Sequence, residues 1–181
     1  RGGLGHVNVV VSMIFSGMSG SAVADAAGLG VIEYKAMTER GYEKKLAAGI
    51  TGASATIGPI IPPSIIMIIY ASVAQESVGA MFIGGIIPGI LMGLSLMVTI
   101  YILAIKEGIE PLKRIRPRKL AAASLKAIPA LLAPVLIIGG ILLGYFTPTE
   151  AAIVVSAYAL SLAFLYYRTL SLSQLYEDLL R

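Results

Sequence analysis

The feature that most constrains this chain is the near absence of charge over two long runs. Residues 46–105 contain one charged side chain, Glu76, and residues 127–167 contain only Glu150. Each run can hold two apolar helices of about 20 residues, the length that crosses a bilayer. Only 13% of the residues are charged and the mean hydropathy is +0.86, whereas a soluble domain carries about 25% charged residues. The sequence therefore predicts an all-α polytopic membrane protein.

Charged segments divide the chain into six parts. These are a helical hairpin with a cytoplasmic joint (residues 1–45), a discontinuous transmembrane helix (46–78), a transmembrane helix (79–105), a basic cytoplasmic loop (106–126), two transmembrane helices (127–168) and an interfacial amphipathic helix (169–181). Residues 106–119 contain six basic and two acidic side chains, so the positive-inside rule places them in the cytoplasm. The polar joint at residues 33–45 then lies on the same side. We attribute the net charge of +4 to basic residues that flank the membrane spans, and not to nucleic-acid binding.

The first part differs from an ordinary transmembrane span. From Ser12 to Gly30, twelve of nineteen residues are Gly, Ala or Ser. A helix from Gly20 to Glu33 would be about 20 Å long, well short of the ~30 Å hydrocarbon core. We therefore expect a re-entrant hairpin whose second helix begins near Ala22 inside the bilayer. Because the chain starts at Arg1 without a signal pattern, we interpret it as an internal segment of a larger protein.

The tip of this hairpin is the first candidate site. Its residues are Ser19, Gly20, Ser21 and Asp25. Either serine can cap the second helix, whose free amides and positive dipole end suit a carboxylate, while carbonyls and hydroxyls in the turn suit a hard cation such as Na⁺. The alternative is that the small residues only allow close helix packing, and that Asp25 pairs with a neighbour or lies near an aqueous edge.

The second candidate site is a break within the apolar run of residues 46–74. Its residues are Ser54, Thr56, Gly58, Pro59, Pro62 and Pro63. Proline cannot continue a helix, so carbonyls around residues 54–58 are expected to be open near mid-membrane. Hydroxyls at Thr51 and Ser64 add polarity without charge, as expected for a desolvated cation and a polar solute. The alternative is an ordinary proline kink.

Five segments in order resemble a known family across essentially the whole chain. They are GHVNV at residues 5–9, the small-residue run at residues 16–30, GPIIPPS at residues 58–64, GIIPG at residues 85–89 and FTPTEAA at residues 146–152. Together they resemble the large membrane subunit of TRAP (tripartite ATP-independent periplasmic) transporters.

The resemblance implies an elevator-type secondary transporter in the cytoplasmic (inner) membrane of a bacterium or archaeon. It implies uptake of organic acids such as C4-dicarboxylates or sialic acid, with Na⁺ as the coupling ion and no other cofactor. The implied partners are a small membrane subunit, a periplasmic solute-binding protein and the lipid bilayer. By this likeness, the hairpin tip and the break at residues 56–63 together form one Na⁺ site and half of the solute pocket.

Two readings from other classes compete with transport. An intramembrane hydrolase could use Ser19 or Ser21 as a nucleophile, but no His or Lys lies in the apolar runs to act as its base. With no Cys and one His, a Cys- or His-built metal site is also disfavoured, so we expect no enzyme. The second reading is a structural subunit that scaffolds a partner without its own transport site.

Glu150 is expected to be an N-terminal acid of the last membrane helix.

Overall fold

The computed structural model describes residues 2–109, 111, 117–169, 171 and 174, and the side chains of residues 117–122 are left out of the description. All regular elements of this part are helical. Three helices are long and apolar enough to cross a membrane: Val78–Lys106, Ala123–Leu142 and Pro148–Tyr166. These helices confirm the predicted all-α polytopic membrane fold. The chain forms two compact units, residues 1–115 and 116–181, which are described separately.

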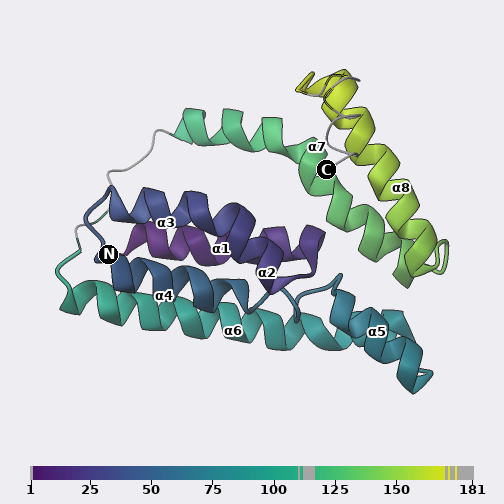
Figure 1. The fold of residues 1–181 in the computed structure, drawn as a ribbon, viewed down its shortest axis with the longest axis horizontal. Helices are drawn as coiled ribbons and strands as arrows, with labels where there is room; N and C mark the ends of the chain where they lie inside the picture. The colour runs from purple at the N-terminus through teal and green to yellow at the C-terminus, as the bar shows by residue number, and fades with distance from the viewer. Residues whose placement is uncertain (1, 110, 112–116, 170, 172–173, 175–181) are drawn as a thin grey trace. The chain divides into compact units, whose positions relative to one another are not determined.

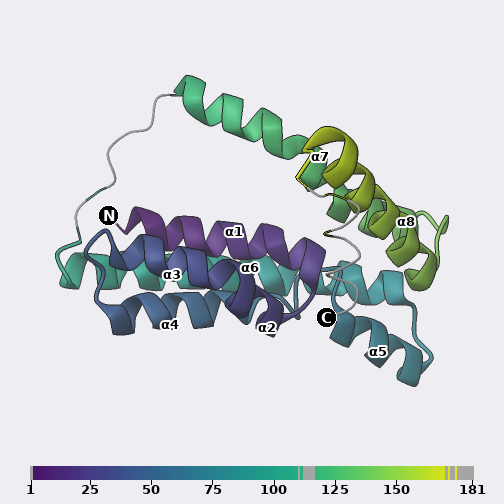
Figure 2. The same cartoon turned by 45° about the horizontal axis from the view of Figure 1, so that its top comes forward.

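The first unit begins with a helical hairpin. Its first arm is α1 (Gly3–Ser19), and its returning arm is formed by α2 (Ala22–Ala24), the π-helical η1 (Asp25–Leu29) and α3 (Gly30–Thr38). The arms are in contact along η1 and α3 and lie side by side in both views (Figures 1 and 2). At the tip, the Ser21 hydroxyl accepts the Ala24 N–H at 3.4 Å. The predicted cap of a helix beginning at Ala22 is confirmed.

The polar joint between the hairpin and the next helix is shorter than predicted. We expected residues 33–45 to be a polar joint, but α3 continues to Thr38 and α4 (Lys44–Ala55) already begins at Lys44. The turn between them contains Gly41 at φ 85°. The reason is tertiary, because Met37 is only 1% exposed and its burial holds the last turn of α3 against the core.

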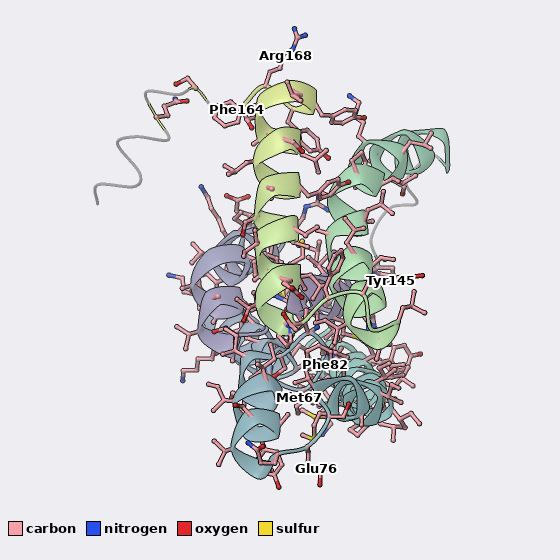
Figure 3. The ribbon with its side chains drawn as sticks, turned by 90° about the vertical axis from the view of Figure 1, so that its right-hand side faces the viewer. Met67, Glu76, Phe82, Tyr145, Phe164 and Arg168 are labelled. Atoms are coloured by element: carbon pink, nitrogen blue, oxygen red, sulfur yellow. The ribbon has the colours of Figure 1, made fainter. Side chains whose placement is uncertain are left out.

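The predicted discontinuous helix is present. Helix α4 ends at Ala55, and α5 (Ile65–Ala74) begins after nine non-helical residues that include a cis Pro62–Pro63 bond. Helix α6 (Val78–Lys106) contacts α1, α4 and α5. In Figure 1, α4 runs beside one half of α6 and α5 lies beside the other, and Figure 3 shows Met67 where α5 meets α6. The apolar core joins α1, α3, α4 and α6 through Val9, Met37, Ala47, Ile50, Ile57 and Ile100.

The second unit is a helical pair, α7 (Pro117–Leu142) and α8 (Pro148–Ser161), with α8 extended by η2 (Leu162–Tyr166). The Tyr158 hydroxyl donates to the Pro129 carbonyl at 2.7 Å, which ties the two helices together. Figure 3 shows Tyr145 at the turn between α7 and α8, and Arg168 beyond the opposite end of α8.

One predicted boundary in this unit is wrong, and another prediction lies almost entirely outside the described residues. Residues 117–126 were assigned to the basic loop at residues 106–126, but α7 begins at Pro117. Proline is favoured at the first helical position, and the residues that follow are mostly Leu, Ala and Lys, which are strong helix formers. The amphipathic helix predicted at residues 169–181 falls almost entirely outside the described residues.

Candidate functional site

The hairpin tip lies directly against the break in the α4–α5 helix. A Cβ atom built at Gly20 would be 2.6 Å from the Pro63 carbonyl oxygen, and one built at Gly58 would be 3.2 Å from the Ser21 carbonyl carbon. Gly20 also has φ 58°, a conformation that favours glycine. The structure therefore brings Gly20, Ser21, Gly58 and Pro63 together, backbone against backbone, the adjacency that the family resemblance implied.

The polar groups of the break are engaged more fully than predicted. The Ile57 and Gly58 amides donate to the carbonyls of Ser54 and Ala55 at 3.0 Å. The Ile57 carbonyl accepts the amides of both Ile60 and Ile61. The expectation of open carbonyls around residues 54–58 is therefore wrong for Ser54, Ala55 and Ile57, because tight i to i+3 turns satisfy them after the α-helix ends.

The remaining predicted residues of the break and tip have local roles. Thr56 is exposed and its hydroxyl donates to the Ala53 carbonyl at 2.6 Å. The Pro59 carbonyl accepts the hydroxyl of buried Ser64 at 2.6 Å, and Ser64 also caps α5. Pro62 and Pro63 are buried, whereas Pro59 is half-buried. At the tip, the Ser19 hydroxyl accepts the Ser21 amide at 3.5 Å.

Behind the tip lies a group of buried polar side chains that we call the buried polar cluster. Its members come from α1, η1 and α4, and they are Asn8, Ser12, Ser16, Asp25, Thr51 and Ser54. The Asn8 amide group joins the two long helices: its nitrogen donates to the Thr51 hydroxyl at 3.2 Å, and its oxygen accepts from the Ser54 hydroxyl at 2.5 Å. The Ser12 hydroxyl donates to Ser54 at 3.2 Å.

Sequence reasoning found Ser54 and Asp25 but did not assign Asn8, Ser12 or Ser16 to a site. These three residues are spaced by four, which places them on one face of α1. That spacing is a usable signal, because a polar stripe on an otherwise apolar helix has to face protein or water.

Asp25 is the unusual member of the cluster. It is 1% exposed and lies beside Ser12, yet neither of its carboxyl oxygens has a hydrogen-bond partner among the described residues. The Ser12 hydroxyl is the neighbour that interacts with this carboxyl group, so the alternative that Asp25 pairs with a neighbour or lies near an aqueous edge stays a prediction beside the ion-site one. Glu33, two turns further along the same arm, also has two buried and unpartnered carboxyl oxygens there. A buried carboxylate is costly unless a proton or a cation compensates for its charge.

The arrangement of the helices is typical of one class of protein. A helical hairpin in contact with a broken helix, beside long apolar helices, is the arrangement that secondary transporters use to build sites inside a membrane. The chain also matches, over residues 1–181, the family described as "Tripartite ATP-independent periplasmic transporter, DctM component". The chain belongs to this family.

Individual relatives agree with this assignment. The chain is 48% identical over 177 residues to the sialic acid TRAP transporter permease protein SiaT of Haemophilus influenzae, covering 98% of this chain and 29% of that protein. It is 48% identical over 178 residues to the large permease protein SiaM of Vibrio cholerae (98% and 42%). It is 43% identical over 174 residues to the C4-dicarboxylate permease DctM of Pseudomonas aeruginosa (96% and 41%). The chain thus spans less than half the length of these relatives, which are transport proteins and not enzymes.

Proposed function

We propose that this chain is part of the permease subunit of a Na⁺-coupled, binding-protein-dependent importer of organic acids. The permease lies in the inner membrane of a bacterium or archaeon and moves its solute by an elevator motion. Its partners are a small membrane subunit and a periplasmic solute-binding protein. The support is family membership, together with relatives named for sialic acid and C4-dicarboxylates, which are both carboxylates.

One observation carries the proposal: the backbone contact between the hairpin tip at Gly20 and Ser21 and the break at Gly58 and Pro63. The helix starting at Ala22 has its N-terminus at this contact, where the Ala22 nitrogen is 3.3 Å from a Cβ atom built at Gly58, and a helix N-terminus suits a carboxylate. The candidate ligands for Na⁺ are the backbone and hydroxyl oxygens of the turn and the break other than the carbonyls of Ser54, Ala55 and Ile57, which already accept amides. Asp25 adds a carboxyl group behind the tip that has no protein partner among the described residues.

The test uses the full-length permease with its partner subunit and binding protein in proteoliposomes. Uptake of radiolabelled sialic acid and of succinate is measured with an inward Na⁺ gradient and with K⁺ in its place. We expect one carboxylate to accumulate only with Na⁺ and the binding protein. An assembled complex that accumulates neither solute, or does so equally well with K⁺, contradicts the proposal and favours the scaffolding alternative.

A matched pair of variants tests the role of the tip and the break. Gly58→Leu forces a side chain into the backbone of Ser21 and Ala22, whereas Gly84→Leu enters open space on α6. We expect Gly58→Leu to abolish Na⁺-driven uptake while the protein still inserts, and Gly84→Leu to retain uptake. Wild-type uptake with unchanged Na⁺ dependence in Gly58→Leu would mean that this contact only packs.

A further inference from the structure

A groove of about 190 Å³ runs between α4 and α6 in the first unit. It is lined from α4 by Lys45, Leu46, Gly49, Ile50 and Ala53, and from α6 by Leu96, Thr99, Ile100 and Leu103. The α4 residues span nine positions, so the groove is about 12 Å long at 1.5 Å per residue. This length and the largely apolar lining suit part of an extended hydrocarbon chain.

The groove exists because α4 presents small residues where it passes α6. A Cβ atom built at Gly49 would meet nothing within 4 Å, and Ala53 follows it one turn later. Ile50 and Ile100, 6% and 3% exposed, form the floor. Thr99 is the one hydroxyl-bearing residue of the lining, and its hydroxyl donates to the Ser95 carbonyl at 2.9 Å. The lining along the groove therefore has no hydroxyl donor left for a polar ligand.

One end of the groove is basic. Lys45 lines it, Lys44 precedes it at the start of α4, and Lys106 follows Leu103 by about one turn at the end of α6. These lysines are exposed, and Lys45 has no ion-pair partner within the described part of the chain. Glu43 and Glu107 lie at the same end, so lysines exceed acids there by one.

We propose that this groove is a binding site for an anionic phospholipid, with one acyl chain between α4 and α6 and the phosphate beside Lys45. The bilayer supplies both parts of such a ligand, and an apolar groove with a cationic end matches both. An unfilled groove would forfeit the dispersion contacts of its walls, which an acyl chain restores. This site goes beyond the proposed function and does not depend on Na⁺ coupling or on the transported solute.

The first test maps lipid contact on the wild-type, full-length complex. The complex is placed in nanodiscs containing a photoactivatable phosphatidylglycerol with a diazirine on its acyl chain, illuminated and digested for mass spectrometry. We expect labelled peptides from residues 45–53 and 96–103. Absence of label from both segments overturns the proposal, because it means that another part of the protein covers the groove or that lipid there exchanges without binding.

The second test separates the acyl-chain and headgroup contributions by native mass spectrometry of the delipidated complex titrated with phosphatidylglycerol or phosphatidylcholine. Gly49→Leu should fill the groove and lower the bound fraction of both lipids about five-fold, whereas Gly52→Leu, on the same helix in open space, should not. Lys45→Gln should remove the preference for phosphatidylglycerol, whereas Lys35→Gln on α3 should keep it. Unchanged binding in both Gly49→Leu and Lys45→Gln would contradict the proposal. Since no transport is measured, failure here leaves the proposed function untouched.

Discussion

At the scale of single residues, the contact between the tip and the break depends on the absence of side chains. Gly20 has both a left-handed φ of 58° and a backbone oxygen, that of Pro63, where its Cβ would be. Gly58 has no left-handed φ, and a Cβ atom there would be 3.2 Å from the Ala55 carbonyl oxygen and the Ser21 carbonyl carbon. Gly28, later in the same hairpin, has neither. Substitutions at these three glycines therefore distinguish the free-energy cost of a left-handed φ from the cost of a steric clash between the new side chain and the backbone.

The substitution Gly20→Ala should destabilise the hairpin tip and reduce uptake. An L-residue in the left-handed region costs about 1–2 kcal/mol, and the methyl group must in addition displace the backbone at Pro63. We expect a lower midpoint of thermal unfolding in detergent and a loss of Na⁺-driven uptake in proteoliposomes. Gly28→Ala is the control and should match the wild-type protein in both measurements. A Gly20→Ala protein equal to Gly28→Ala would show that the tip is free to shift.

Asp25 and Ser54 should respond to mutation in opposite ways. Ser54→Ala leaves the buried Asn8 carbonyl oxygen without its donor, so it should cost about 1–3 kcal/mol of stability. Asp25→Asn removes a carboxyl group that has no partner among the described residues, so stability should stay equal or rise. Uptake by Asp25→Asn should nevertheless be lost if this group compensates the coupling ion.

Thermal unfolding and Na⁺-driven uptake of both variants measure these two effects. The result that would contradict this view is an Asp25→Asn protein that is strongly destabilised, since this would reveal a partner that holds the carboxyl group in place.

At the scale of elements, the start of α8 shows how local sequence can determine a helix boundary. The Thr147 hydroxyl accepts the Glu150 amide at 3.3 Å, and the Glu150 carboxylate accepts the Thr147 amide at 2.8 Å, with Pro148 at the first helical position. This is a capping box, and it confirms the expected N-terminal role of Glu150.

Removing the cap should loosen only the first turn of α8. Thr147→Ala should cost about 1 kcal/mol, which corresponds to roughly five-fold faster amide exchange where opening is local. Hydrogen exchange with mass spectrometry on peptides covering residues 147–155 would measure it. Thr149→Ala, two residues away in the first turn, is the control. Equal protection in the two variants would mean that packing, and not the cap, holds this turn.

At the scale of the whole molecule, the first unit has two distinct ends. Met37, Tyr42, Ala104 and Ile109 belong to one core cluster, so the α3–α4 turn and the end of α6 lie together. Glu76 precedes α6 at its other end, and α6 is long enough to cross the bilayer. With basic segments at the first end, the positive-inside rule assigns that end to the cytoplasm.

Single-cysteine labelling of the full-length protein, in a cysteine-free background, tests this topology. A membrane-impermeant maleimide should reach Arg40→Cys and Glu107→Cys only after the inner membrane is permeabilised. It should reach Glu76→Cys in cells whose inner membrane is intact. Labelling of position 40 or 107 from the periplasm would reverse the orientation.

The membrane class, the long apolar helices and the two interruptions at Gly20 and at Pro62–Pro63 can be predicted from the amino-acid sequence alone. These features follow from local causes: long runs without charge require lipid, and proline and glycine restrict or release the backbone regardless of what surrounds them. The same locality explains why a serine cap of the helix at Ala22, predicted at Ser19 or Ser21 and found at Ser21, and the N-terminal role of Glu150 were predicted correctly.

Only the tertiary structure decided which groups meet. The spacing of Asn8, Ser12 and Ser16 is compatible both with a polar site and with simple close packing of helices. They belong to the buried polar cluster because Thr51 and Ser54 of α4 lie opposite them and form hydrogen bonds with Asn8 and Ser12. The length of α3 depends on the burial of Met37 against the core. The carbonyls at the break accept hydrogen bonds from amides in tight turns, and the sequence did not predict the geometry of these turns. Partner choice at these positions depends on which helix faces approach one another, and a one-dimensional pattern does not contain that information.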